Sequence, residues 1–498
     1  MRPSRVVAAA LALALVPLAA PAMGAEPRTS PEPEVLLVWH DCPADLASWE
    51  CATLTVPRNW FQPSALTAKI ELAVKRARKE SVGPLTFNPG GPGGSGLQAA
   101  TRVYGTLPPR IKDSFDFVAW DPRGVGASMP QLTGCGLTAP RPRSVFPPTG
   151  SVDWLAFTRS WAATTSPQLQ ACWEANPGVA PYLGTDYVVR DLEAMREQLG
   201  YEKWSILGLS YGSRIGFRYA RAYPDRVRAL VLDGAWDPNA SISEWAAADT
   251  WAFTYAQSVF SSLFGKRMAA RFARVLRALN NRTVVIDGRV RTRWDLTLMM
   301  LGDISQQAAY PDIVAVIDTV YDAMFRSTTR SQERRASEAL ARLEVLAQDQ
   351  RSSEYTLNMV MCADMVGRPS LEETAKFAET AYLNSSVLAS LVAVTKGITC
   401  EGLPAEIAPP YPPLEEELTL PTPPVVINAL GDSRTPWLGA RTLANYLTGS
   451  AFITYNGTQH VVYRRVPSTC VNAPVTEYIL SLSVPSSITC DYAPLRTQ

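Results

Sequence analysis

Histidine is the scarcest side chain in this sequence, and its scarcity limits the chemistry. Only His40 and His460 occur among the 498 residues. No two cysteines have the C-x-x-C spacing, and no cysteine–histidine spacing is typical of a zinc site. We therefore expect no metal centre, and the sequence contains no pattern that calls for an organic cofactor.

An excess of charge of either sign is also missing. The chain has 47 Lys and Arg against 46 Asp and Glu, and it contains no basic tract. Such a balance is unfavourable for binding nucleic acid, so we expect no nucleic-acid partner. After residue 25, no uninterrupted apolar run approaches the roughly 20 residues that a membrane span needs. We expect no integral membrane span once the leader described next is removed.

The first 25 residues have the organisation of a signal peptide. Arg2 and Arg5 form a short basic region, and residues 6–20 form an apolar region. Residues 20–22 offer an A-x-A cleavage site, and Ala25 offers a second one. The prediction is an extracytoplasmic protein, either secreted or associated with the cell envelope.

Cysteine usage agrees with export. An even count in an exported chain favours disulfides. Eight cysteines allow 105 connectivities, so closeness in the sequence is the only guide to their pairing. It suggests Cys42 with Cys51, Cys135 with Cys172, Cys362 with Cys400, and Cys470 with Cys490.

The pentapeptide GLSYG at 208–212 is the most informative motif. It follows an apolar run at 204–207 and precedes a helix-like stretch at 213–223. A strand, a G-x-S-x-G turn and a helix together form a nucleophile elbow, which exposes the serine in a strained backbone conformation. By itself the pattern often arises by chance. Its context predicts that Ser210 is a nucleophile.

A nucleophilic serine needs a base, which is usually histidine. His460 follows the serine in the chain, in a turn-rich loop after the apolar run at 451–455. His40 precedes the serine and sits close to Cys42, so we assign it a structural role. The sequence thus predicts His460 as the general base.

The third member of such a triad is an acid that orients the histidine. Residues 424–430 read as a buried strand, and Asp432 follows that strand at once. Because ligands gather at the carboxyl ends of strands in open α/β sheets, Asp432 is well placed for catalysis. The alternative is an aspartate that only shapes a turn. We predict Ser210, Asp432 and His460 as the catalytic residues.

A glycine-rich segment, PGGPGGSG at 89–96, follows an apparent strand at 85–87. Glycines let a backbone approach a substrate closely and direct its N–H groups toward it. We predict an oxyanion hole formed by the N–H groups of Tyr211 and Gly91. A flexible linker is less consistent with the flanking strands, and a P-loop lacks its Lys-Ser/Thr.

The organisation of the chain predicts an α/β fold. Apolar runs at 85–87, 117–120, 204–207 and 230–233 alternate with helical stretches, which favours a doubly wound, mostly parallel sheet. The predicted domains are residues 26–238 as the first part of the core, 239–415 as a helical cap inserted between the sixth and seventh strands, and 416–498 as the second part of the core, carrying the acid and the histidine.

Several segments resemble the prolyl iminopeptidase branch of the α/β-hydrolases, and within it the secreted tripeptidyl aminopeptidases of actinobacteria. These are the segments at 51–57, 89–96, 120–128, 208–212, 431–436 and 459–460. The resemblance covers nearly the whole mature chain but is weak from 239 to 413, where a cysteine pair expected near 251–264 is missing.

The resemblance implies an exported serine hydrolase, an aminopeptidase that releases short peptides, of the tripeptidyl or prolyl type, from free N-termini. Its substrate would be a peptide or an ester. Such a peptidase needs a cap carboxylate for the substrate ammonium. The candidates are Glu244, Asp249, Asp303, Asp312, Glu354 and Asp364. The alternatives are an exported carboxylesterase or lactonase with the same triad, and a non-enzymatic binding protein on this fold.

Overall fold

The computed structural model describes residues 34–135, 151–293, 304–349, 354–383, 387–405, 407 and 416–494. Within these ranges, ten strands form one sheet in the order β1-β2-β3-β5-β4-β6-β7-β10-β11-β12. The predicted signal peptide lies outside the described residues, as do residues 406 and 408–415 at the end of the predicted cap.

The sheet begins with antiparallel strands that the sequence did not predict. They are β1 (Leu36–His40), β2 (Glu50–Pro57) and β3 (Thr67–Lys75). β3 pairs antiparallel with β5 (Asp116–Trp120), which joins this part to the rest of the sheet. β1 is an edge strand whose residues are mostly exposed, so its sequence lacks the buried alternation that would have revealed it.

The remaining strands pair in parallel, which confirms the predicted doubly wound, mostly parallel sheet. Every residue of β4, β5, β6, β10 and β11 is buried, because helices cover both faces of the sheet. The strands not yet given are β4 (Pro84–Asn88), β6 (Trp204–Leu209), β7 (Val227–Asp233), β10 (Val425–Ala429), β11 (Ala451–Tyr455) and β12 (Ile488–Cys490).

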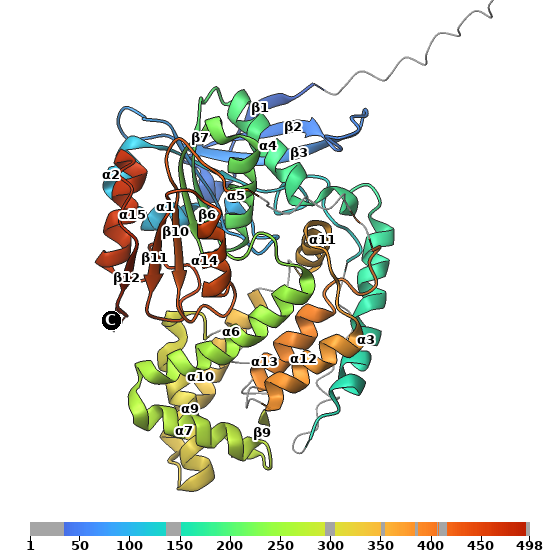
Figure 1. Ribbon diagram of the computed structural model, residues 1–498, viewed down its shortest axis with the longest axis vertical. Helices are drawn as coiled ribbons and strands as arrows, with labels where there is room; N and C mark the ends of the chain where they lie inside the picture. Colours follow the sequence, from blue (N-terminus) through green and yellow to red (C-terminus); the bar gives the residue numbers. More distant parts are fainter. Residues whose placement is uncertain are drawn as a thin grey trace, which may run out of the picture.

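Two sets of helices flank the sheet (Figure 1). Apolar residues of α4 (Thr185–Gln198), α5 (Tyr211–Ala222) and α14 (Trp437–Asn445) join one core cluster. Those of α1 (Gly96–Thr106), α2 (Pro109–Ser114) and α15 (Thr469–Ser481) join a second cluster on the opposite face. The chain passes from β4 to β5 on one side and then returns to β6 on the other side of β4. This switch point is where α/β sheets bind ligands.

A helical layer lies at one end of the sheet, in the lower half of Figure 1. Its main part follows β7, the seventh strand of the described sheet, whereas the sequence predicted an insertion after the sixth strand. The difference arises because the antiparallel N-terminal strands add to the number of strands that precede the cap. Its elements are α6 (Ile242–Leu263), α7 (Gly265–Leu279), β8 (Val284–Ile286), β9 (Arg289–Arg291), α9 (Tyr310–Phe325), α10 (Arg330–Asp349), α11 (Glu354–Asp364), α12 (Leu371–Leu383) and α13 (Val387–Gly397).

Helix α3 (Trp154–Ala175) comes from the first part of the chain but packs in this layer. Its residues Trp154, Phe157 and Trp161 form one buried cluster with Ala378 of α12 and Leu391 of α13. The layer is therefore not one continuous insertion. The domain boundaries stay a prediction, and a boundary at 238 would separate α3 from the helices that it contacts.

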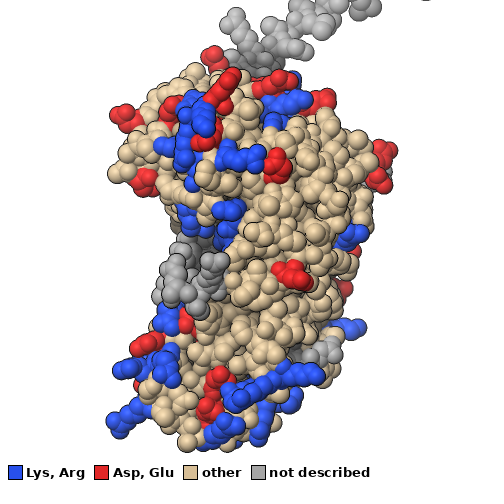
Figure 2. Space-filling view, turned by 90° about the vertical axis from the view of Figure 1, so that its left-hand side faces the viewer, with Lys and Arg blue, Asp and Glu red and all other residues tan. Residues whose placement is uncertain are grey.

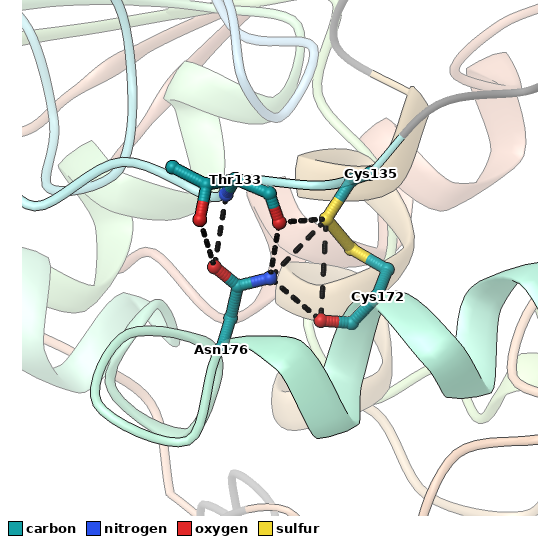
Figure 3. Close-up of a disulfide and its surroundings, with 4 residues drawn as sticks. All are labelled: Thr133, Cys135, Cys172 and Asn176. Carbon is teal, nitrogen blue, oxygen red and sulfur yellow. Dashed lines mark hydrogen bonds between the residues drawn. A yellow bond between two sulfur atoms is a disulfide. The ribbon is translucent and has the colours of Figure 1, made fainter.

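The four predicted disulfides are confirmed: 42 with 51, 135 with 172, 362 with 400, and 470 with 490. The second one ties the segment after β5 to α3 (Figure 3). Beside it, the Asn176 side chain accepts from the Thr133 N–H at 2.9 Å and donates to the carbonyl oxygens of Thr133 at 2.9 Å and Cys172 at 2.7 Å. This disulfide joins the core to the helical layer.

Charged side chains of both signs are interspersed over the face shown in Figure 2. Many arginines of the cap are paired within it. Arg271 forms an ion pair with Asp318, and Arg342 donates to Asp312 at 2.6 Å. Separately, among the described residues no helix is both long enough and apolar enough to cross a membrane.

Candidate active site

The predicted nucleophile sits in a strained turn between β6 and α5. Ser210 has φ 56° and ψ −128°, a conformation that L-residues seldom adopt. Its N–H donates to the carbonyl oxygen of Asp233, the last residue of β7, at 2.8 Å. A Cβ on Gly208 would lie 2.5 Å from the Gly212 oxygen, and one on Gly212 would lie 2.3 Å from the Asn88 oxygen. Crowding on both sides explains why the elbow needs glycines.

The predicted acid and base are in contact. His460 Nδ1 lies 2.9 Å from Asp432 Oδ2 and 3.1 Å from Oδ1. Asp432 is buried, and its Oδ1 also accepts from the Arg434 N–H at 2.8 Å and the Thr435 N–H at 3.1 Å. Asp432 is thus held in one orientation, directed toward the imidazole.

Thr435 is a contact of this pair that sequence reasoning missed. Its hydroxyl donates to Asp432 Oδ2 at 2.9 Å and lies 3.3 Å from His460 Nδ1. It follows the acid by three positions, in the same strand-end segment that the sequence singled out. A search of that segment for hydroxyl groups would have found it.

Ser210 and His460 are brought to the same place by one stretch of main chain. The carbonyl oxygen of Asp233 accepts the Ser210 N–H, and a Cβ on the next residue, Gly234, would lie 3.2 Å from His460 Cε1. Among the described residues, we find no hydrogen bond between the Ser210 hydroxyl and the imidazole. Such bonds in free enzymes are often long and tighten when substrate binds.

The glycine-rich loop packs directly against the elbow. A Cβ on Gly90 would lie 2.5 Å from the Leu209 oxygen and 2.7 Å from the Tyr211 nitrogen. The Gly90 N–H is occupied, since it donates to Asn88 Oδ1 at 2.9 Å. In the part of the chain that the structure describes, we find no acceptor for the Gly91 N–H. The N–H groups predicted for the oxyanion hole therefore come from two backbone segments in van der Waals contact.

The Tyr211 side chain anchors the elbow to the cap. Its ring is buried, and its hydroxyl is hydrogen-bonded to Thr185 Oγ1 and to Asp364 Oδ2 of α11. Burial, with the Asp364 charge as the second cause, raises the pKa of Tyr211 well above its ordinary value. Arg214 Nε lies 3.2 Å from the same carboxylate. The Thr185 N–H also donates to Asp364 Oδ1 at 2.8 Å, so Asp364 already has three partners in the fold.

The other carboxylates proposed for the substrate ammonium differ in their surroundings. Glu244 closes a capping box with Ser241, and Asp312 pairs with Arg342. Asp303 and the side chain of Glu354 lie outside the described residues. Only Asp249 among the described candidates is almost fully buried and lacks a complete set of hydrogen bonds.

Asp249 lies on α6 with 1% of its surface exposed. Its Oδ2 is 3.9 Å from Lys396 Nζ, and its Oδ1 has no hydrogen-bond partner among the described residues. Burial raises the pKa of Asp249 to about 7; Lys396 and Arg434 oppose this shift, and Asp432 adds to it.

The path of α6 places Asp249 over the site. Trp245 packs edge-to-face with Trp236, whose ring in turn packs against Tyr211. Further along α6, Val259 lies where a Cβ on Gly431 would come within 3.0 Å of it. At about 100° per residue, the two α6 contacts and Asp249 lie on one side of the helix. Along the helix, Asp249 therefore lies between Trp245, whose contacts lead to the elbow, and Val259, which lies beside the residue before Asp432.

A pocket of about 260 Å³ adjoins the glycine-rich loop. Gly93, Gln98 and Gly126 line it from the core, and Tyr355 and Thr356 of α11 line it from the cap. Within the described ranges, no three His, Cys, Asp or Glu side chains gather in a way that could hold a metal ion.

Curated relatives carry names from the same enzyme class. Serine protease Hip1 of Mycobacterium tuberculosis is 29% identical over 456 residues, which cover 88% of this chain and 86% of that protein. Carboxylesterase B of the same organism is 27% identical over 526 residues, with 96% of each chain covered. Tripeptidyl aminopeptidase of Streptomyces lividans is 34% identical over 214 residues, which are 40% of this chain and 38% of that protein.

A protein-family model described as the alpha/beta hydrolase fold matches residues 83–463. The match begins just before β4 and ends just after the predicted histidine, so it contains the glycine-rich loop, the elbow and the acid. The chain therefore belongs to the α/β-hydrolase family.

Proposed function

We propose that this protein is a serine hydrolase that works through Ser210, His460 and Asp432. The observation that carries the proposal is the contact of 2.9 Å between the His460 imidazole and the buried Asp432 carboxylate, beside a strained serine. With Nδ1–H donating to Asp432, the Nε2 lone pair is free to accept the Ser210 proton.

The reaction is acyl transfer to water. The Ser210 oxygen attacks the substrate carbonyl carbon while His460 takes its proton, and the N–H groups of Tyr211 and Gly91 bind the oxyanion. The tetrahedral intermediate collapses, and His460 passes the proton to the leaving amine or alcohol. Water, activated by the same histidine, then hydrolyses the acyl-enzyme and regenerates the serine.

We infer that the substrate is a peptide with a free N-terminus. Hip1 and the tripeptidyl aminopeptidase support a peptidase. The further support is Asp249, whose unpaired oxygen lies on the cap helix that crosses the site. A buried carboxylate that has one oxygen without a hydrogen-bond donor is suited to bind a substrate ammonium, because an ammonium offers both positive charge and three donors.

Ester hydrolysis is the second candidate. The relative named carboxylesterase B matches 96% of the chain, so it supports an esterase about as strongly as Hip1 supports a peptidase. An esterase with this triad would not need Asp249 for binding. The two candidates thus differ in what they require of one side chain.

We also propose that the protein works outside the cytoplasm, secreted or retained in the cell envelope. Four disulfides in one chain are typical of an oxidising compartment. The signal-peptide pattern of residues 1–25 agrees with this location.

The deciding experiment combines a probe with a substrate panel. A fluorophosphonate should label the wild type and not Ser210→Ala. Equal labelling of both proteins would rule out the proposed triad. The panel consists of aminoacyl-, dipeptidyl- and tripeptidyl-anilides, their N-acetylated forms, and short- and long-chain esters. Turnover that requires the free amine supports the aminopeptidase, and turnover of esters alone supports the esterase.

A further inference from the structure

The main chain and the side chain of Asp233 are hydrogen-bonded next to two different predicted catalytic residues. Its carbonyl oxygen accepts the Ser210 N–H at 2.8 Å. Its carboxylate accepts the Val462 N–H, at 2.9 Å to Oδ1 and 3.0 Å to Oδ2, and the Tyr463 N–H at 2.7 Å to Oδ2. Those two N–H groups follow His460 by two and three residues.

The backbone is strained in both of the segments to which Asp233 is hydrogen-bonded. Ser210 has φ 56° and Val461, directly after His460, has φ 60°. A positive φ is a true outlier for a β-branched residue such as valine. Strained residues persist only where surrounding contacts over-determine them. The Asp233 carboxylate binds the two N–H groups that follow Val461, so it supplies that constraint on the histidine loop.

We propose that Asp233 is a positioning residue that sets the distance between nucleophile and base by binding the main chain beside each of them. It touches neither the substrate nor the reacting atoms. The register of β7 fixes the serine side of this link, and the side chain fixes the histidine side. This inference rests on the proposed roles of Ser210 and His460.

The carboxylate is suited to this task only when it is ionised. Three N–H···O contacts occupy both oxygens, and protonation adds an O–H donor among these N–H donors and weakens the protonated oxygen as an acceptor. Burial raises the pKa of Asp233 to about 6, which the two N–H donors and His460 oppose and Asp432 reinforces. Tyr463 and Arg465 are the other titratable or charged groups that the carboxylate influences. Ionised Asp233 should therefore be lost as the pH falls through about 6.

The test compares Asp233→Asn with Asp116→Asn. Asp116 is a matched control, because it is also a buried strand-end aspartate that accepts a backbone N–H, from Ala77 at 2.9 Å, but at the opposite end of the strands. Asparagine keeps the shape of Asp233 and replaces one acceptor by a donor. Displacements of about 1 Å reduce rates about 10²-fold, so kcat and the rate of fluorophosphonate labelling should fall by that factor, with KM changed less than about twofold. Asp116→Asn should keep both rates.

The pH dependence of labelling, compared between the wild type and Asp233→Asn, supplies a second measurement. A neutral fluorophosphonate avoids the charge of Asp249. Because Asp233 is protonated as the pH falls through about 6, the wild-type labelling rate should fall more steeply with pH there than the rate of Asp233→Asn. Equal steepness in the two proteins, unchanged kcat in Asp233→Asn, or an equal loss in Asp116→Asn would each overturn the proposal. Activity in Ser210→Ala would instead refute the triad.

Discussion

Replacing Gly90 by alanine tests the oxyanion hole without replacing any of the predicted catalytic residues. A Cβ there would lie 2.5 Å from the Leu209 oxygen, 2.7 Å from Ser210 Cβ and 2.7 Å from the Tyr211 nitrogen. Two of these three atoms are backbone and the third is fixed by the elbow, so none can move aside as the end of a flexible side chain could. The residue also has φ +87°, which alanine adopts only with strain.

The size of the effect follows from these contacts. Ordinary van der Waals contact begins near 3.4 Å, so the loop must withdraw from the elbow by about 0.7 to 0.9 Å. The Gly91 N–H would withdraw with it, while the Tyr211 N–H stays with the serine. Loss of one oxyanion donor lowers kcat about 10² to 10³-fold, or about 2.7 to 4 kcal/mol. We expect a decrease in kcat of at least 10²-fold, with a smaller change in KM.

The assay is steady-state hydrolysis of the best anilide or ester, with thermal unfolding to show that the variant is folded. Gly105→Ala is the matched control, because a Cβ at this position in α1 meets nothing within 4 Å and alanine favours a helix. Its kcat should equal that of the wild type. A folded Gly90→Ala with a kcat within threefold of the control would refute the assignment of this loop to the oxyanion hole.

Three further outcomes are expected. Asp249→Asn should raise KM for free-amine peptides about 10²-fold or more, because removing one member of a buried charge pair costs about 3 to 5 kcal/mol. The KM values for N-acetylated and ester substrates should stay unchanged. An equal effect on all substrates would argue against ammonium binding. Because burial raises the pKa of Asp249 to about 7, the wild-type KM for free-amine peptides should also rise as the pH falls below 7. Thr435→Val should lower kcat about tenfold, by loss of its hydrogen bond to Asp432, and Thr435→Ser should retain activity; similar kcat values for the two variants would contradict that role. Reduction of the four disulfides should lower the melting temperature, measured by calorimetry with and without reductant, and an unchanged value would show that they add no stability.

The parallel half of the fold was predictable because its signals are local. Buried strands such as Ala451–Tyr455 appear as short apolar runs between turns, and the structure places a strand at each run that the sequence marked. The antiparallel strands were missed. β1 at the sheet edge buries little and carries no clear pattern, whereas β2 and β3 bury alternate residues, so their period-2 pattern was present but not used. The packing of α3 with the cap was missed for another reason: its partners, α12 and α13, lie more than 190 residues further along the chain.

Of the site, the sequence by itself determined the elements that chain order and residue type control. With two histidines in the chain, the choice of His460 as the predicted base was almost forced, and the strand endings pointed to Ser210 and Asp432 as the predicted nucleophile and acid. A glycine-rich loop and an elbow are likewise local conformations, which a few residues encode. The pairing of the cysteines followed from their closeness.

Only the tertiary structure decided which distant groups support these residues. Asp233 and Thr435 act through contacts that depend on strand register, and the cap holds the histidine loop through the bond from the His460 N–H to the Ser305 oxygen at 2.7 Å. Burial of Asp249 likewise depends on how the cap helix α6 packs over the predicted site. The physical reason is that burial, charge proximity and hydrogen-bond partnership arise from long-range packing, whereas a single sequence records only local preferences.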